Sequence, residues 1–63
     1  MRESDIMYEG ARYWVGRDRE HKAYVVYKKQ PYHSYSVSDS AYNMDDDGLS
    51  IALVRAKYLE DNT

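Results

Sequence analysis

The sequence predicts an α+β fold in which a three-stranded antiparallel meander carries one C-terminal helix on one of its faces. Only residues 47–59 repeat their apolar residues at helical spacing. Projection at about 100° per residue gathers on one side of this helix the residues Leu49, Ala52, Leu53, Ala56 and Leu59. The segments before it have the composition or the alternation of strands, and the short connections between them favour adjacent antiparallel pairing.

The first two predicted strands are residues 11–15 and 23–29. Because side chains alternate along a strand, Tyr13 and Val15 should share one face, with Arg12 and Trp14 on the other. The polar residues 16–22 form the intervening loop. The second strand is apolar on both faces before its lysine end, which is typical of a central strand. Residues 6–8 either begin the first strand or form a separate fourth strand.

The third predicted strand covers residues 33–38 and follows a turn at Pro31, which cannot donate to a sheet ladder. Tyr35 and Val37 should point inward, and the intervening serines should face solvent. Residues 43–48 supply helix N-cap candidates, and their carboxylates lie at the positive end of the helix dipole.

The predicted helix has a second apolar stripe, which falls opposite the first and consists of Ile51, Val54 and Tyr58. A small sheet can cover only one side of a helix. This stripe therefore predicts a protein interface, with a homodimer as one form of it. The alternative is that the meander curls round the helix and covers both stripes.

Length limits the chain to one domain, residues 1–63, in which 1–5 and 60–63 are expected to fray. The chain has no cysteine, eight tyrosines, one tryptophan and no phenylalanine, so its core must be thin and closed partly by tyrosine rings. No apolar run approaches the roughly 18 residues of a membrane span, and the N-terminus lacks a signal-peptide core. We expect a cytoplasmic protein without a membrane partner.

No pattern in the sequence predicts an enzyme, a cofactor or a metal site. His21 and His33 have no nearby second ligand, and the glycines do not form a phosphate-binding loop. Residues 43–48 have the spacing of the first half of an EF-hand, but Val54 stands where that loop needs a glutamate. Helix capping is therefore the expected role of these residues.

Two surfaces are predicted to bind protein, either a second copy or a host protein. One is the helix stripe, and the other is a sheet face that carries Trp14 and Tyr24 together with Val26.

Single-stranded nucleic acid is the alternative partner, because basic and aromatic residues interleave in the first half of the chain. Residues 1–33 have seven Lys and Arg against five Asp and Glu, whereas residues 34–63 have two against six. The candidate contacts are Arg12, Trp14, Arg17, Arg19, Lys22, Tyr24, Lys28 and Lys29.

From Tyr13 to Leu59, the order of an aromatic hairpin, a serine-alternating strand and an Asp-Gly-Leu-Ser-Ile-Ala helix resembles small uncharacterised reading frames of bacteriophages and plasmids. The resemblance includes no diagnostic motif and implies no activity. It implies an accessory protein that binds a host or viral macromolecule.

Overall fold

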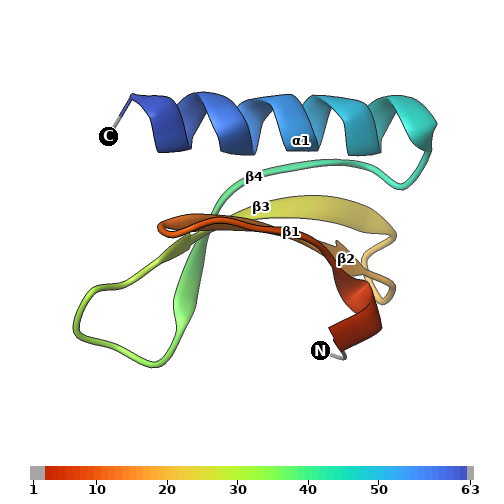
Figure 1. The fold of residues 1–63 in the computed structure, drawn as a ribbon. Coiled ribbons are helices and arrows are strands. Elements are labelled where there is room, and N and C mark those ends of the chain that lie inside the picture. The colour runs from red at the N-terminus through yellow and green to blue at the C-terminus, as the bar shows by residue number, and fades with distance from the viewer. Residues whose placement is uncertain (1–2, 63) are drawn as a thin grey trace.

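The chain forms a four-stranded antiparallel sheet covered on one face by a helix, as the computed structural model of residues 3–62 shows (Figure 1). A short 3-10 helix, Glu3–Asp5, precedes the sheet. The strands lie in chain order and are followed by the helix: β1 (Ile6–Glu9), β2 (Tyr13–Asp18), β3 (Ala23–Lys29), β4 (Ser36–Asn43) and α1 (Asp46–Asp61). The α+β class and the C-terminal helix are confirmed. The prediction of three strands is wrong, and the alternative of a separate fourth strand at residues 6–8 is confirmed, because residues 6–9 form a strand of their own that pairs with β2.

The core lies between α1 and the middle of the sheet. Val15 of β2 pairs with Val26 of β3, and both side chains are fully buried. Ala52 and Ala56 face them from the helix and are also fully buried. Their small side chains let the helix backbone approach the sheet closely. Burial of each valine contributes about 1.5 to 3 kcal/mol, so this small cluster supplies much of the apolar stabilisation.

The last strand differs from its prediction in position and in which of its residues pack against the core. It covers residues 36–43 rather than 33–38, and Tyr35 and Val37, which were predicted to point inward, are 59% and 41% exposed. Val26 pairs with Ser40 while Tyr27 pairs with Ser38, so Asp39 is an extra residue in a β-bulge. An extra residue moves the residues that follow it to the opposite face from the one that strict alternation would give them. As a result, Tyr42 is the aromatic side chain that packs against the core.

The two ends of the described chain are more ordered than predicted. Asp5 is only 6% exposed, and its Oδ1 lies 3.1 Å from Nε of Arg17 and 2.9 Å from Nε of Arg19. Burial alone would raise the pKa of Asp5, but the hydrogen bonds and charges of the two arginines outweigh it and lower that pKa. Glu60 is held by backbone hydrogen bonds from Arg12 and Tyr13. The frayed ends predicted at residues 1, 2 and 63 lie outside the described residues.

The helix begins where its capping residues predict. Asp45 is the N-cap, and its Oδ1 accepts a 2.7 Å hydrogen bond from the backbone N–H of Gly48. The first turn passes so close to the preceding strand that a Cβ at Gly48 would collide with the backbone carbonyl oxygen of Asn43. Glycine is therefore required here by a close approach of backbone to backbone.

Candidate protein-binding surface

The apolar stripe on the outer side of α1 is open to solvent. Ile51 is 51% exposed, Val54 is 67% exposed and Tyr58 is 57% exposed. The alternative in which the meander curls round the helix and covers both stripes is therefore wrong. Apolar side chains that lie together and exposed are typical of interaction surfaces.

The stripe borders a shallow groove of about 460 Å³ whose other wall includes Tyr42 of β4. Arg55 lies within the groove lining, and its Nε is 3.2 Å from Oδ2 of Asp39, the bulged residue of β4. Its guanidinium carbon also lies 5.9 Å from the centre of the Tyr58 ring, within the range of a cation–π contact. The stripe, Arg55 and the edge strand β4 therefore form one continuous surface, which we call the α1–β4 groove.

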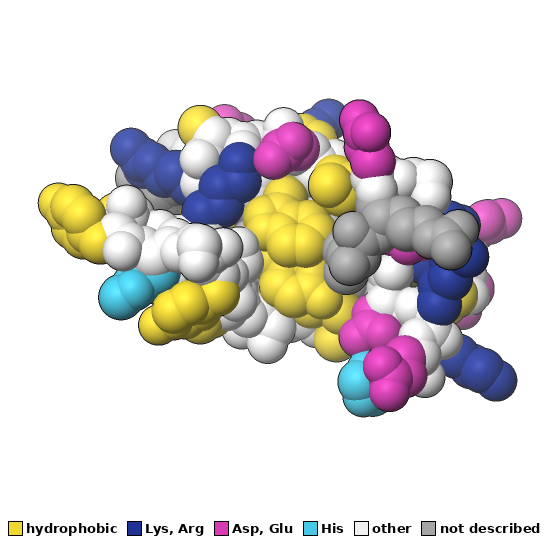
Figure 2. All heavy atoms as spheres, turned by 90° about the horizontal axis from the view of Figure 1, so that it is seen from below, with side chains coloured by type: hydrophobic (Ala, Val, Ile, Leu, Met, Phe, Trp, Pro, Cys, Tyr) yellow, Lys and Arg dark blue, Asp and Glu magenta, His cyan; other side chains and the backbone are white. Residues whose placement is uncertain are grey.

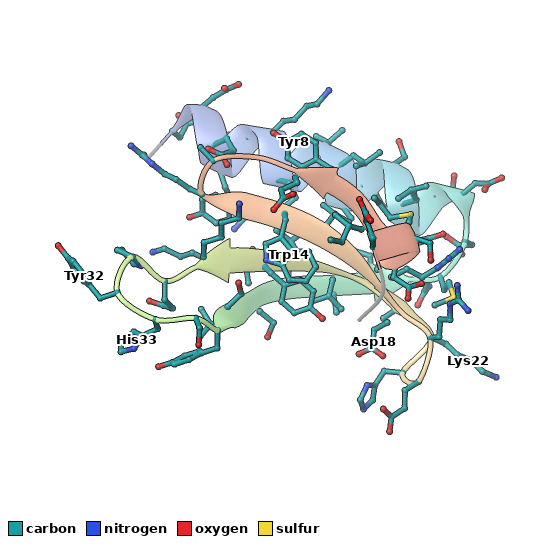
Figure 3. The ribbon with its side chains drawn as sticks, turned by 60° about the horizontal axis from the view of Figure 1, so that its bottom comes forward. Tyr8, Trp14, Asp18, Lys22, Tyr32 and His33 are labelled. Atoms are coloured by element: carbon teal, nitrogen blue, oxygen red, sulfur yellow. The ribbon has the colours of Figure 1, made fainter. Side chains whose placement is uncertain are left out.

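The second predicted surface does not exist as a single surface. Trp14 lies on the sheet face away from the helix, where its ring stacks on that of Tyr27 with 4.1 Å between centroids (Figure 3). Its Nε1 donates a 3.0 Å hydrogen bond to Oγ of Ser36. Tyr24 and Val26 lie on the opposite face, against the core beneath α1. The sequence could not reveal this, because the relative facing of β2 and β3 depends on their register.

Hydrophobic side chains also gather at the centre of the uncovered sheet face (Figure 2). Trp14 and Tyr27 belong to this face, and both are partly buried. The two rings stack on each other, and the indole N–H is hydrogen-bonded to Ser36. Much of this aromatic surface therefore already makes contacts within the chain.

The predicted nucleic-acid contacts are separated by the fold. Arg17 and Arg19 both pair with Asp5, and Nζ of Lys29 lies 3.2 Å from Oε2 of Glu9. Lys28 pairs across the sheet with Tyr13, which places it and Tyr24 on the face opposite Trp14. Lys22 lies in the turn between β2 and β3, and Arg12 lies in the connection from β1 to β2. These residues do not form one basic face around the tryptophan.

The two histidines lie in the connections at opposite ends of β3, with His21 between β2 and β3 and His33 between β3 and β4. Figure 3 labels His33 in its connection. Nδ1 of His21 lies 2.8 Å from Oδ2 of Asp18, and the hydrogen bond between the two side chains raises the pKa of the imidazole. His33 stacks on Tyr35 with 5.0 Å between ring centroids. Within residues 3–62, no three His, Cys, Asp or Glu side chains come together as a metal site.

Tyr42, Asp39 and Arg55 are the groove residues that the sequence did not reveal. Arg55 does follow Ile51 by four residues, a spacing that places neighbours on one side of a helix. This spacing could have indicated that Arg55 lies beside the apolar stripe. The pairing with Asp39 depends on the β-bulge, for which the sequence contains no local indication.

Comparisons of the chain with protein-family models, curated proteins and solved structures find no match. The resemblance to phage and plasmid reading frames therefore stays a prediction. Across residues 3–62, the fold contains no helix with the length and apolar character needed to cross a membrane.

Proposed function

We propose that this is a non-enzymatic binding protein and that it binds another protein through the α1–β4 groove. The observation that supports this most directly is the alignment of Ile51, Val54 and Tyr58, each more than half exposed, along one wall of a groove. Tyrosine and arginine are the side chains that most often dominate binding energy at interfaces, and this groove has Tyr42, Tyr58 and Arg55.

The size of the stripe indicates what the partner must provide. Full burial of a valine or isoleucine side chain contributes about 1.5 to 3 kcal/mol, and about half of that remains to be gained from each exposed stripe residue. Association costs at least about 4 kcal/mol in lost translation and rotation. The stripe alone can offset little more than this cost. The partner must therefore also contact β4 or pair with Arg55 to bind stably.

Site-specific photocrosslinking tests this proposal in the cells from which the protein comes. We expect Val54→p-benzoylphenylalanine to form a covalent adduct with a protein on irradiation. Lys57→p-benzoylphenylalanine is the matched control, because Lys57 is exposed on the same helix but does not line the groove.

The adduct at position 54 should disappear when Ile51→Glu and Tyr58→Ser are added, while the helical circular dichroism stays unchanged. Equal labelling at positions 54 and 57, or no protein adduct at position 54, would contradict binding at the groove.

A further inference from the structure

We infer that the occupant of the α1–β4 groove is a second copy of this chain, paired antiparallel along the exposed edge of β4 so that the two sheets become one. The inference rests on the proposed function, since it names the partner of the same surface. Four observations support it: the state of the β4 edge, the spacing of the helices, the charges beside the stripe and the thin core.

The two edges of the sheet differ. β1 has only four residues and an irregular register between Ile6 and Tyr8, and short, irregular edges resist pairing with another strand. β4 has eight residues and contains no lysine, arginine or proline. Its single charged residue, Asp39, is paired with Arg55. Among the described strands, β4 therefore offers the longer edge, with few of the features that block strand addition.

The bulge at Asp39 divides β4 into two parts with different surroundings. The first part descends away from the helix, whereas the end of the strand runs alongside α1 (Figure 1). Ala41, Tyr42 and Asn43 line a second hollow of about 370 Å³, which they share with Ile51 and Asp47 of the helix. We assign the pairing to residues 40–43, because only there does an open strand edge adjoin the apolar stripe.

Strand pairing at this edge would place the two helices side by side. α1 lies over β2, β3 and β4, and neighbouring strands are about 4.8 Å apart. A copy joined through β4 would then hold its helix about 14 Å from this one, somewhat beyond the 8 to 10 Å of closely packed helices. Long side chains are needed to fill that space, and Tyr58 and Arg55 point into it from the groove wall.

The charges beside the stripe fit an antiparallel copy. Asp47 and Arg55 lie four residues before and after Ile51 and flank the same side of the helix. A two-fold axis near Ile51 places each residue before Ile51 in one copy beside the residue that follows Ile51 by the same number of positions in the other copy. Asp47 of each copy would therefore face Arg55 of the other, and the isologous contact would be both apolar and charge-complementary.

The small core favours the same arrangement. Val15 and Val26 are the largest fully buried side chains of the described chain, and domains below about 70 residues without disulfides or metals often depend on oligomerisation. A standard interface takes about 800 Å² from each partner. That is roughly one-sixth of the 4573 Å² surface of this chain, an area that one side of the two layers can supply.

Sedimentation equilibrium tests the inference with purified protein. We expect a mass of about 15 kDa, twice the 7.5 kDa of the chain, for the unaltered protein and for Lys57→Glu. Val54→Glu should give the monomer mass while retaining the same circular dichroism. A monomer at all concentrations up to about 1 mM would overturn the inference.

Two further measurements distinguish strand pairing from contact of the helices alone. The chain has no cysteine, so Ile51→Cys introduces one thiol. At the proposed helix spacing the two thiols are too far apart for a disulfide, but a short bis-maleimide linker should join them into a covalent dimer, whereas it should not join Lys57→Cys. Amide hydrogen exchange at residues 40–43 should become at least tenfold faster on dilution below the dissociation constant. A dimer whose exchange at these residues is independent of concentration would overturn the pairing of β4.

Failure of this inference is distinguishable from failure of the proposed function. If the purified protein is a monomer but position 54 still crosslinks to a different protein in cells, a second copy is not the occupant, and binding of a protein at the groove is still supported. A monomeric protein without such an adduct would contradict both the second copy and the proposed binding function.

Discussion

Oε1 of Glu60, in the last turn of α1, accepts a 2.8 Å hydrogen bond from the backbone N–H of Tyr13 at the start of β2. The same oxygen accepts a 2.6 Å hydrogen bond from the backbone N–H of Arg12. One carboxylate thus joins the C-terminal end of the helix to the connection between β1 and β2. Because α1 is the element that covers this face of the sheet, this contact helps to set the position of the α1–β4 groove.

Removal of the Glu60 carboxylate should destabilise the fold in a pH-dependent way. The hydrogen bonds from the Arg12 and Tyr13 amides lower the pKa of Glu60 below its ordinary value of 4.5. A carboxylate with a lowered folded-state pKa stabilises the fold above its unfolded pKa, and this contribution is lost as the pH falls through the folded pKa. Glu60→Ala should therefore lower the urea midpoint at pH 7 more than at pH 3.

Asp61→Ala is the control for this measurement, because it removes the same charge from an exposed neighbour in the same helical turn. Trp14, the single tryptophan, reports unfolding by its fluorescence. Equal midpoint changes for Glu60→Ala and Asp61→Ala at pH 7 would show that the hydrogen bonds contribute nothing specific.

Gly48→Ala should destabilise the protein although alanine is the better helix former. The gain in helix propensity is about 1 kcal/mol. The new methyl group would collide with the carbonyl oxygen of Asn43, which is backbone and cannot rotate away, and overpacking costs about 1 to 3 kcal/mol or more. Because the collision is with backbone, the cost should lie at the upper end of that range, and we expect a net loss of about 1 to 2 kcal/mol in the free energy of unfolding by urea.

Ser50→Ala, at an exposed position in the same turn, provides the comparison. It should change stability by only a few tenths of a kcal/mol, because it alters propensity without a collision. Unchanged or increased stability of Gly48→Ala would show that the chain between β4 and α1 can move to admit the methyl group.

His21 should titrate above its ordinary pKa of 6.5, because Asp18 accepts its hydrogen bond and stabilises the imidazolium. Because the pKa of His21 is higher in the folded than in the unfolded chain, its protonated form stabilises the fold below pH 6.5. This contribution is lost as the pH rises through the folded-state pKa. Proton NMR of the imidazole measures the midpoint directly. Asp18→Asn should lower it, and an identical midpoint in both proteins would rule out the contact in solution.

Single-stranded DNA should not quench the fluorescence of Trp14. The indole is stacked on Tyr27 and bonded to Ser36, and Arg17 of β2 and Arg19 of the following turn both pair with Asp5, which cancels one of their two charges. A ten-nucleotide thymine oligonucleotide at about 20 mM salt is the probe. Quenching that weakens steeply with added salt is the signature of nucleic-acid binding. Such quenching would support the alternative that the basic and aromatic residues of the first half of the chain bind single-stranded nucleic acid.

Local periodicity was enough to predict several features of this fold from the sequence. The helix, a capping residue within residues 43–48 and the two apolar stripes follow from spacing along a single element. The boundaries of β3 follow from its continuous apolar and aromatic residues. The facing of Tyr13 and Val15 follows from alternation within one strand. Each of these depends on residues that are close in the chain.

Only the tertiary structure decided which faces and charges meet. Trp14 and Tyr24 lie on different strands, so their separation to opposite faces depends on the pairing of β2 with β3. The bulge at Asp39 shifts the alternation of β4, so that Tyr42 lies on the core face, and the carboxylate of Asp39 pairs with Arg55. Sequence alone determined that α1 has two apolar sides, because helical spacing is local. The place of the open side beside β4 depends on contacts between distant residues.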